Sequence, residues 1–204
     1  VANREYAERR LLNGPEKEAM GLLAASLIPD FCSVSLNIGT TTEQVARALA
    51  GHTGLVVISN NINIISLLMG GKARELVIMG GAVRPTDGAI VGEDAVDFIS
   101  RYKVDVAVIG ASALDADGAI LDFDSREVAV SRAILKNSRT RICVADVSKF
   151  DLSAPVRICQ IEDLDYFVTD REPPRSFIEA AKQGQTEILV AGQGKTRDAS
   201  AAAK

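Results

Sequence analysis

The feature that most constrains the fold is a regular alternation of short aliphatic segments with segments of helical periodicity. Helical patterns cover residues 15–28, 42–50, 62–69, 93–101 and 124–138. β-like segments cover residues 33–38, 55–59, 75–79, 104–109, 141–145, 166–169 and 187–190. Alternation of this kind predicts a parallel sheet. Because segment 104–109 is almost wholly aliphatic, we expect helices on both faces of the sheet.

This pattern predicts one α/β domain with an open, mostly parallel sheet over residues 13–191. Residues 1–12 are charged, and we interpret them as a linker from an upstream segment. Residues 192–204 are small and polar, so we expect them to be disordered.

Composition argues against several functional classes. One histidine, His52, and three widely spaced cysteines are too few for a zinc cluster or a histidine-based triad, so we expect no metal and no cofactor. The cysteines lie among aliphatic or small residues, as buried thiols do. The net charge is −4 with dispersed basic residues, which predicts poor binding of nucleic acid by this segment itself. Without a membrane-length apolar run or a signal-like leader, we expect no membrane association and a cytoplasmic location.

The loops that follow the strands are where such a sheet binds its ligands. The first loop runs Asn37-Ile38-Gly39-Thr40-Thr41-Thr42 and leads into a helix. Its backbone N–H groups, its hydroxyls and the positive end of the helix favour a phosphate. A capping box formed by Thr41 and Gln44 explains the same residues equally well. The sequence lacks the glycine patterns of dinucleotide-binding folds and of P-loops.

Two further loops carry amide, glycine and arginine side chains, each with a structural and a functional interpretation. Asn60 and Asn61 either cap a helix or bind a ligand. Gly80 and Gly81 either form a tight turn or allow a ligand to approach closely, and the turn is favoured. Arg84 either reaches a phosphate or is solvated.

The remaining loops carry charged pairs. Asp124 and Glu127 lie three residues apart at a helix start, where they form a capping pair or contact a ligand. Lys149 follows a strand near Asp146, where it faces an anion or forms a surface ion pair. The functional interpretation gains weight because all six loops, with segment 110–112 among them, should open at one edge of one sheet.

Taken in order, these loops resemble the sensor domain of DeoR-type bacterial transcription regulators. The family's pattern runs Asp-x-Gly-Thr-Thr, Thr-Asn-Asn, Gly-Gly-x-x-Arg, Phe-Asp-x-x-Glu and Asp-x-Ser-Lys-Phe. Each element has a counterpart here in the same order, between about residue 13 and about residue 190. Asn37 stands where the family usually has aspartate, and Ser59 where it has threonine. The first departure leaves that position without its charge.

The resemblance implies a fold related to ribose-5-phosphate isomerase and the coenzyme A transferases, used for sensing. It implies that the glycine and threonines of the first loop hold a phosphate and that the paired asparagines complete the cradle. The later carboxylates and lysine would contact a polyol. The expected effector-binding residues are Asn37, Gly39, Thr40, Thr41, Asn60, Asn61, Gly81, Arg84, Asp124, Glu127 and Lys149.

Within the family, segments 87–93, 97–100, 123–124 and 137–139 look most like those of members that respond to glycerol 3-phosphate. Glycerol 3-phosphate is therefore the expected effector. The resemblance also implies that effector binding releases operator DNA, which an N-terminal helix-turn-helix domain absent from this chain would hold. It further implies a homodimer or homotetramer.

Two other functions use the same features. A carboxylate base and a lysine beside a phosphate cradle suit an aldose-ketose phosphate isomerase, with Asp124, Glu127 and Lys149 moving protons. A purely oligomerising module with an empty pocket is the third possibility. Because the ordered pattern matches the regulators, we expect a sensor without enzyme activity.

Overall fold

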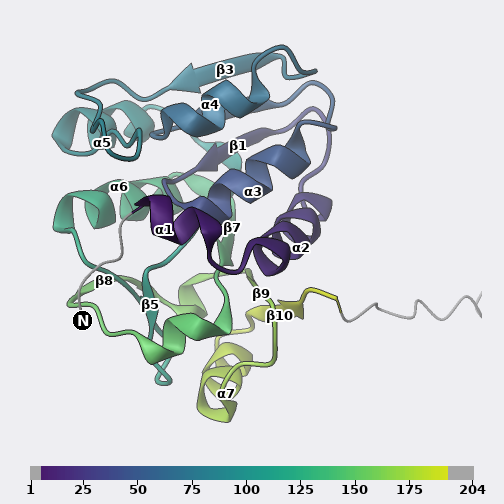
Figure 1. The fold of residues 1–204 in the computed structure, drawn as a ribbon, viewed down its shortest axis with the longest axis vertical. Coiled ribbons are helices and arrows are strands. Elements are labelled where there is room, and N and C mark those ends of the chain that lie inside the picture. The colour runs from purple at the N-terminus through teal and green to yellow at the C-terminus, as the bar shows by residue number, and fades with distance from the viewer. Residues whose placement is uncertain (1–5, 193–204) are drawn as a thin grey trace, which may run out of the picture.

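The computed structural model describes residues 6–192, and its centre is a seven-stranded sheet (Figure 1). The strand order is β10-β9-β7-β4-β1-β2-β3, and every neighbouring pair is parallel. The expected parallel sheet is confirmed, because each β-like segment of the sequence contributes one strand. The strands are β1 (Ser33–Leu36), β2 (Val56–Ser59), β3 (Glu75–Ile78), β4 (Val104–Ile109), β7 (Ser138–Val144), β9 (Tyr166–Thr169) and β10 (Glu187–Val190).

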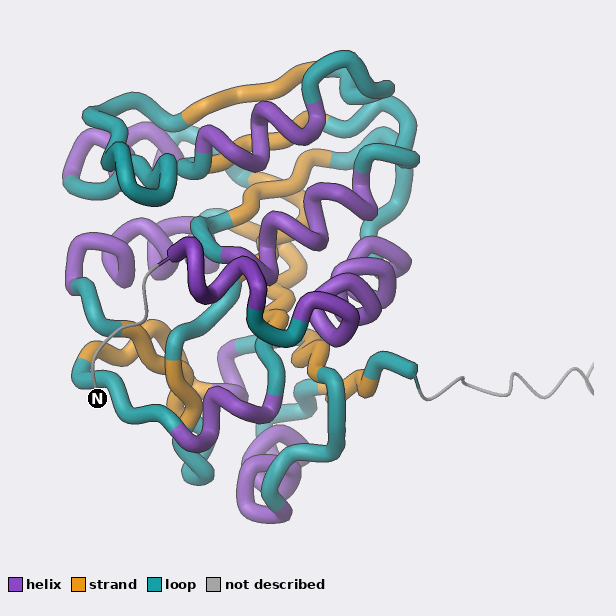
Figure 2. The backbone as a smooth tube through the Cα atoms, viewed as in Figure 1, coloured by secondary structure: helices purple, strands orange, loops and turns teal. Residues whose placement is uncertain are grey.

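Helices cover both faces of this sheet (Figure 2). Successive residues of β4 point to opposite faces, so Val106 and Val108 enter one hydrophobic core while Ala107 and Ile109 enter the other. The first core contains apolar side chains of α2 (Gly14–Ser26), α3 (Thr40–Leu49) and α4 (Ile62–Leu68). The second contains those of α5 (Glu93–Ser100), α6 (Ser125–Lys136) and α7 (Arg175–Gln183).

A small antiparallel sheet beside the main one was not predicted from the sequence. Its strand order is β5-β6-β8, formed by β5 (Ala113–Leu114), β6 (Ala119–Asp122) and β8 (Val156–Gln160). Helix α7 and two 3₁₀ helices, η1 (Val147–Asp151) and η2 (Ile161–Asp163), were likewise not predicted from the sequence. Strands of two to five residues give too short a pattern to recognise. This sheet brings Ser112 and Asp122 toward the loops of the main sheet.

The segment interpreted as a linker contains a helix, α1 (Tyr6–Leu11), which lies beside the start of α3 in Figure 1. None of its residues is buried. Asn13, with a left-handed φ of 54°, separates α1 from α2. The first five residues of the expected linker, and nearly all of the tail expected to be disordered, lie outside the described residues.

The three cysteines are all free thiols. Cys143 and Cys159 are buried free thiols, as predicted, whereas Cys32 is only partly buried. Across residues 6–192, every helix is too short or too polar to cross a lipid bilayer.

Gly21 gives a test of how closely α2 and α3 pack. A methyl group on Gly21 would lie 2.7 Å from the backbone oxygen of Gln44 in α3. Gly21→Ala therefore forces the two helices apart, and we predict that it lowers the free energy of unfolding by roughly 1–3 kcal/mol. Urea denaturation measures this change.

The matched control is Gly14→Ala at the start of the same helix, where an added methyl group meets no atom within 4 Å. We expect this variant to unfold at the same urea concentration as the parent or a slightly higher one. Equal stability of Gly21→Ala and Gly14→Ala would contradict the close contact.

Candidate anion-binding site

A pocket opens at the carboxyl edge of the main sheet, where ligands of parallel sheets bind. Four of the six loops expected to meet there line it directly, and α1 adds two side chains. The lining residues are Tyr6, Arg9, Ile38, Gly39, Thr40, Thr41, Asp87, Gly110, Ala111, Ser112, Asp122, Glu127 and Lys149. Segments separated by more than 100 residues thus meet at one place.

The start of α3 forms one wall of the pocket. The residue before the helix, Gly39, has a φ of 141° and no side chain with which to cap it. The alternative prediction of a Thr41 capping box is wrong, because Thr41 lies inside the helix and the capping position belongs to Gly39. The first helical bond joins the N–H of Glu43 to the carbonyl of Gly39 at 3.0 Å. The preceding N–H groups therefore remain available to an anion.

Positive side chains surround this helix start. Lys17 of α2 is only 4% exposed, and its Nζ donates to Thr40 Oγ1 at 3.0 Å and to the Arg9 carbonyl at 2.5 Å. Burial, and then the charge of Lys149, lower the pKa of Lys17 to about 8, although Asp146 opposes the shift. Since the Arg9 charge adds to this lowering, three cations lie near one another. Such a cluster is costly until an anion neutralises it.

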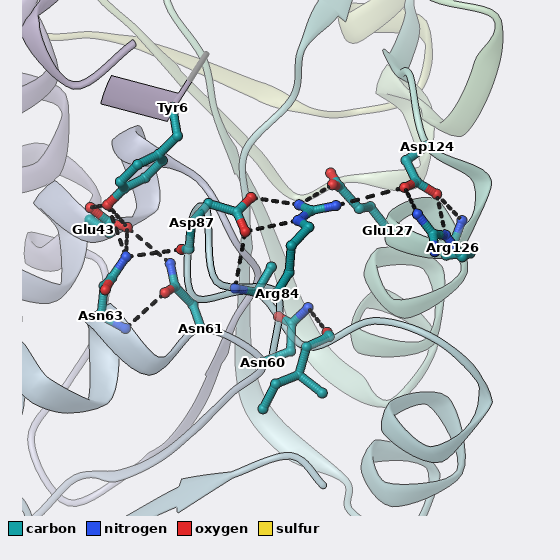
Figure 3. A network of polar contacts seen from close by, with 12 residues as sticks. Tyr6, Glu43, Asn60, Asn61, Asn63, Arg84, Asp87, Asp124, Arg126 and Glu127 are labelled. Atoms are coloured by element: carbon teal, nitrogen blue, oxygen red, sulfur yellow. Dashed lines mark hydrogen bonds and ion pairs between the residues drawn. The ribbon is translucent and has the colours of Figure 1, made fainter. Parts of the chain in front are cut away.

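Carboxylates also line the pocket, namely those of Asp87, Asp122 and Glu127. Burial raises the pKa of Glu127, and the negative charge of Asp122 raises it further. Burial also raises the pKa of Asp122. Arg84 donates to Glu127 at 2.5 Å and to both oxygens of Asp87 at 2.8 and 2.5 Å (Figure 3). The guanidinium of Arg84 therefore fixes two carboxylates and lies outside the pocket lining.

Three predicted residues are buried outside the pocket lining, and their side chains connect neighbouring loops. Asn37 accepts a hydrogen bond from the Gly110 N–H at 2.9 Å and donates to Ser131 Oγ at 3.0 Å. Asn60 donates to the carbonyl of Ile90 at 2.9 Å. Asn61 caps α4 through the N–H of Asn63, as one interpretation of the sequence predicted, and donates to Glu43 at 3.1 Å.

Gly81 and Asp124 also have structural explanations. A methyl group on Gly81, whose φ is 136°, would lie 2.8 Å from Ile90, which supports the turn interpretation. Asp124 caps α6 by accepting from the Arg126 N–H at 2.8 Å. It also lies 3.7 Å from Arg84. Glu127 contacts the same guanidinium and does not act as the second member of a capping pair.

The structure thus separates the eleven predicted effector-binding residues into two groups. Those that line the pocket are Gly39, Thr40, Thr41, Glu127 and Lys149. Those that surround the lining are Asn37, Asn60, Asn61, Gly81, Arg84 and Asp124. Contact between any of them and an effector stays a prediction.

Sequence reasoning missed Tyr6, Arg9, Lys17, Asp87, Ser112 and Asp122. One of them left a signal, because Lys17 lies three residues before Met20 and seven before Ala24 on the apolar stripe of α2. A lysine on a buried apolar stripe needs a polar or negatively charged partner. Its presence there therefore indicates a polar binding site close to the helix.

Comparison with known proteins identifies the class of domain. The family model of the DeoR C-terminal sensor domain matches residues 12–171. The chain is 39% identical over 195 residues to the glycerol-3-phosphate regulon repressor of Haemophilus influenzae, covering 96% of this chain and 75% of that protein. It is 38% identical over 177 residues to the repressor of the same name from Escherichia coli, covering 87% and 70%.

Solved structures show a similar fold at low identity. The chain aligns with eIF2B beta from Chaetomium thermophilum with a TM-score of 0.54 and 16% identity, over 76% of this chain and 48% of that one. It aligns with ribose 5-phosphate isomerase A from Methanocaldococcus jannaschii with a TM-score of 0.49 and 18% identity, over 67% and 54%. The chain therefore spans about half the length of these two structures. The similarity to eIF2B beta shows a shared fold and nothing about function.

The buried Lys17 predicts a pH dependence of stability in the absence of a ligand. Between its folded-state pKa of about 8 and its ordinary 10.5, the folded protein binds fewer protons than the unfolded chain. The free energy of unfolding therefore rises over this range. Lys17→Met has no ammonium group and lacks this gain. The free energy of unfolding of the parent should therefore increase relative to that of the variant by up to about 3 kcal/mol as the pH rises from 8 to 10.5.

Urea unfolding of both proteins at several pH values measures this difference, in which the titrating groups that do not interact with Lys17 cancel. A difference that stays constant from neutral pH to above pH 10.5 would show that the ammonium group is not held in a desolvated site.

Proposed function

This chain belongs to the family of DeoR C-terminal sensor domains, and from that premise we propose that its pocket binds a phosphorylated polyol or sugar, with glycerol 3-phosphate favoured. The observation that carries the proposal is that one pocket offers both kinds of hydrogen-bonding group. The uncapped N–H groups at the start of α3, with Arg9 and Lys149, supply donors, and the carboxylates of Asp87, Asp122 and Glu127 supply acceptors. A molecule with a phosphate at one end and hydroxyls at the other matches both.

Each end of the proposed effector is assigned by chemistry. Phosphate oxygens only accept hydrogen bonds, so they suit the backbone N–H groups after Gly39 and the ammonium groups of Lys17 and Lys149. Ionised carboxylates also only accept, so they repel phosphate and suit hydroxyl donors. Glu127 and Asp122 therefore take the hydroxyl groups of glycerol 3-phosphate, which gives the effector one orientation in the pocket.

The surrounding residues keep these groups in place. Arg84 holds Glu127 and Asp87 at fixed positions, and Asp124 lies against the same guanidinium. Asn37 connects the loop after β1 with the loop after β4. In this proposal the family pattern contains two kinds of residue, some that contact the effector and others that position those contacts.

We further propose that effector occupancy changes operator binding in the longer protein, through an N-terminal helix-turn-helix domain, with the protein acting as a homodimer or homotetramer. The matched relatives are named as repressors. An effector that binds two conformations unequally shifts DNA affinity by a coupling of typically about 1 to 3 kcal/mol.

Calorimetric titration with glycerol 3-phosphate, ribose 5-phosphate, inorganic phosphate and glycerol tests the proposal. Thr40→Val removes one hydroxyl and should weaken glycerol 3-phosphate binding several-fold, at roughly 1 kcal/mol. Lys149→Ala removes a charged donor and should weaken it by on the order of tenfold to a hundredfold. The charge-matched control is Lys103→Ala, whose side chain is exposed away from the pocket and should leave affinity unchanged.

Glycerol without phosphate should bind far more weakly than glycerol 3-phosphate. If the parent binds no phosphorylated compound of the panel, the proposed function fails. If Thr40→Val and Lys149→Ala both bind like the parent, the effector binds elsewhere on the protein.

An aldose-ketose phosphate isomerase remains the second candidate because Glu127, with its raised pKa, lines the same pocket as Lys149. A carboxyl group of raised pKa is suited to general acid-base catalysis. The names of the relatives favour the sensor. We expect no turnover of ribose 5-phosphate in a coupled assay. Turnover that is lost in Glu127→Gln would establish the enzyme instead.

A further inference from the structure

Helix α1 is attached to the domain through hydrogen bonds of Tyr6 and Arg9. None of its six residues is buried, and Leu11 at its end is 86% exposed. A helix of this length is not stable by itself in water. Its position beside α3 therefore depends on a few side-chain bonds, and any molecule that adds a bond will favour the attached state.

Tyr6 provides one attachment of α1. Its hydroxyl lies 2.8 and 2.9 Å from the two carboxylate oxygens of Glu43 and accepts from Asn63 Nδ2 at 2.9 Å (Figure 3). Burial and the bond to Glu43 raise the pKa of Tyr6 to about 12, so the phenol remains a donor at neutral pH. Glu43 also accepts from Asn61 at 3.1 Å, which connects α1 to the loop after β2.

Arg9 provides the second attachment and enters the pocket. Its carbonyl accepts from Lys17, whose Nζ also reaches Thr40 in the proposed phosphate site. Its Nε is buried and has no hydrogen-bond partner among residues 6–192. Arg9 lines the pocket together with Asp87 and Asp122, and its charge acts on both of these carboxylates as well as on Lys17.

A buried guanidinium N–H without a partner is unfavourable, and a phosphate oxygen is an acceptor that would satisfy it. We infer that Arg9 is an effector-binding residue contributed by α1, so that the anionic effector and the attachment of α1 stabilise each other. The inference rests on the proposed function and adds to it a residue outside the loops of the sheet. It also makes α1 the segment through which occupancy of the pocket is transmitted, because binding and attachment are reciprocal.

Arg9→Gln tests the inference by removing the charge while keeping a polar side chain. Calorimetric titration with glycerol 3-phosphate should show affinity lower by about tenfold or more, as expected for a lost charge-assisted contact. The matched control is Arg10→Gln, which removes the same charge from the same helix. Arg10 lies over the Tyr6 ring, 5.9 Å from its centroid, and does not line the pocket. The Arg10→Gln variant should bind glycerol 3-phosphate with an affinity close to that of the parent.

Amide hydrogen exchange of residues 7–12 supplies the second readout. Saturating glycerol 3-phosphate should slow exchange across α1 in the parent and in Arg10→Gln, and should slow it much less in Arg9→Gln. Tyr6→Phe keeps Arg9 but removes an attachment, so α1 should exchange faster than in the parent before ligand is added and should still gain protection afterwards.

The outcomes separate this inference from the proposed function. If Arg9→Gln binds like the parent while Lys149→Ala binds weakly, the inference is overturned and the proposed function stands. Unchanged exchange of α1 at saturation overturns the inference in the same way. If the parent binds none of the phosphorylated probes, both fail. Circular dichroism of each variant confirms that a loss of affinity does not come from unfolding.

Discussion

The parallel alignment of the seven strands is the constraint on which the rest of the structure depends. It brings the ends of β1, β4 and β7 to one edge, although they are far apart in the chain. It also turns helix starts toward that edge, because each strand must return through a helix on one face. Backbone N–H groups therefore gather where the strands end, and the pocket forms at this position.

The N–H groups at the start of α3 have no acidic cap, because Gly39 occupies the capping position, although Glu43 follows in the first turn and Asp146 acts on Lys17. Other carboxylates are present, but Arg84 holds two of them. Lys17 and Lys149 lie near the start of α3 instead, at a cost that the lowered pKa of Lys17 reflects. A fold selected only for stability would place an acidic cap at Gly39. The opposite arrangement is typical of a site that binds an anionic ligand and accepts some instability without it.

Much of this fold follows from the sequence, because its signals are local. The aliphatic strands and the amphipathic helices are periodic, so each could be recognised by itself, and the loop at Gly39 was identified from residue type and position. The remaining site residues depend on contacts that no local pattern reveals. Asp122 ends a four-residue strand of the small sheet, and Arg9 reaches the pocket only because α1 folds back beside α3. Similarly, Asn60 and Arg84 were expected at an effector, yet their bonds to Ile90 and to carboxylates became visible only in three dimensions.

Asn37 shows how a departure from the family pattern can be tolerated at such a site. Its Oδ1 accepts from the Gly110 N–H, a bond that an aspartate would also make. Its Nδ2 donates to Ser131 Oγ, and there an aspartate would need the serine hydroxyl to turn and donate instead. Both residues can therefore join the loop after β1 to the loop after β4 and to α6. They differ in charge, and the neutral amide adds no further negative charge to those of Asp146 and Glu43, which already act on Lys17. The asparagine thus keeps the connecting role of the position, and its neutral side chain suits the anionic effector proposed for the pocket.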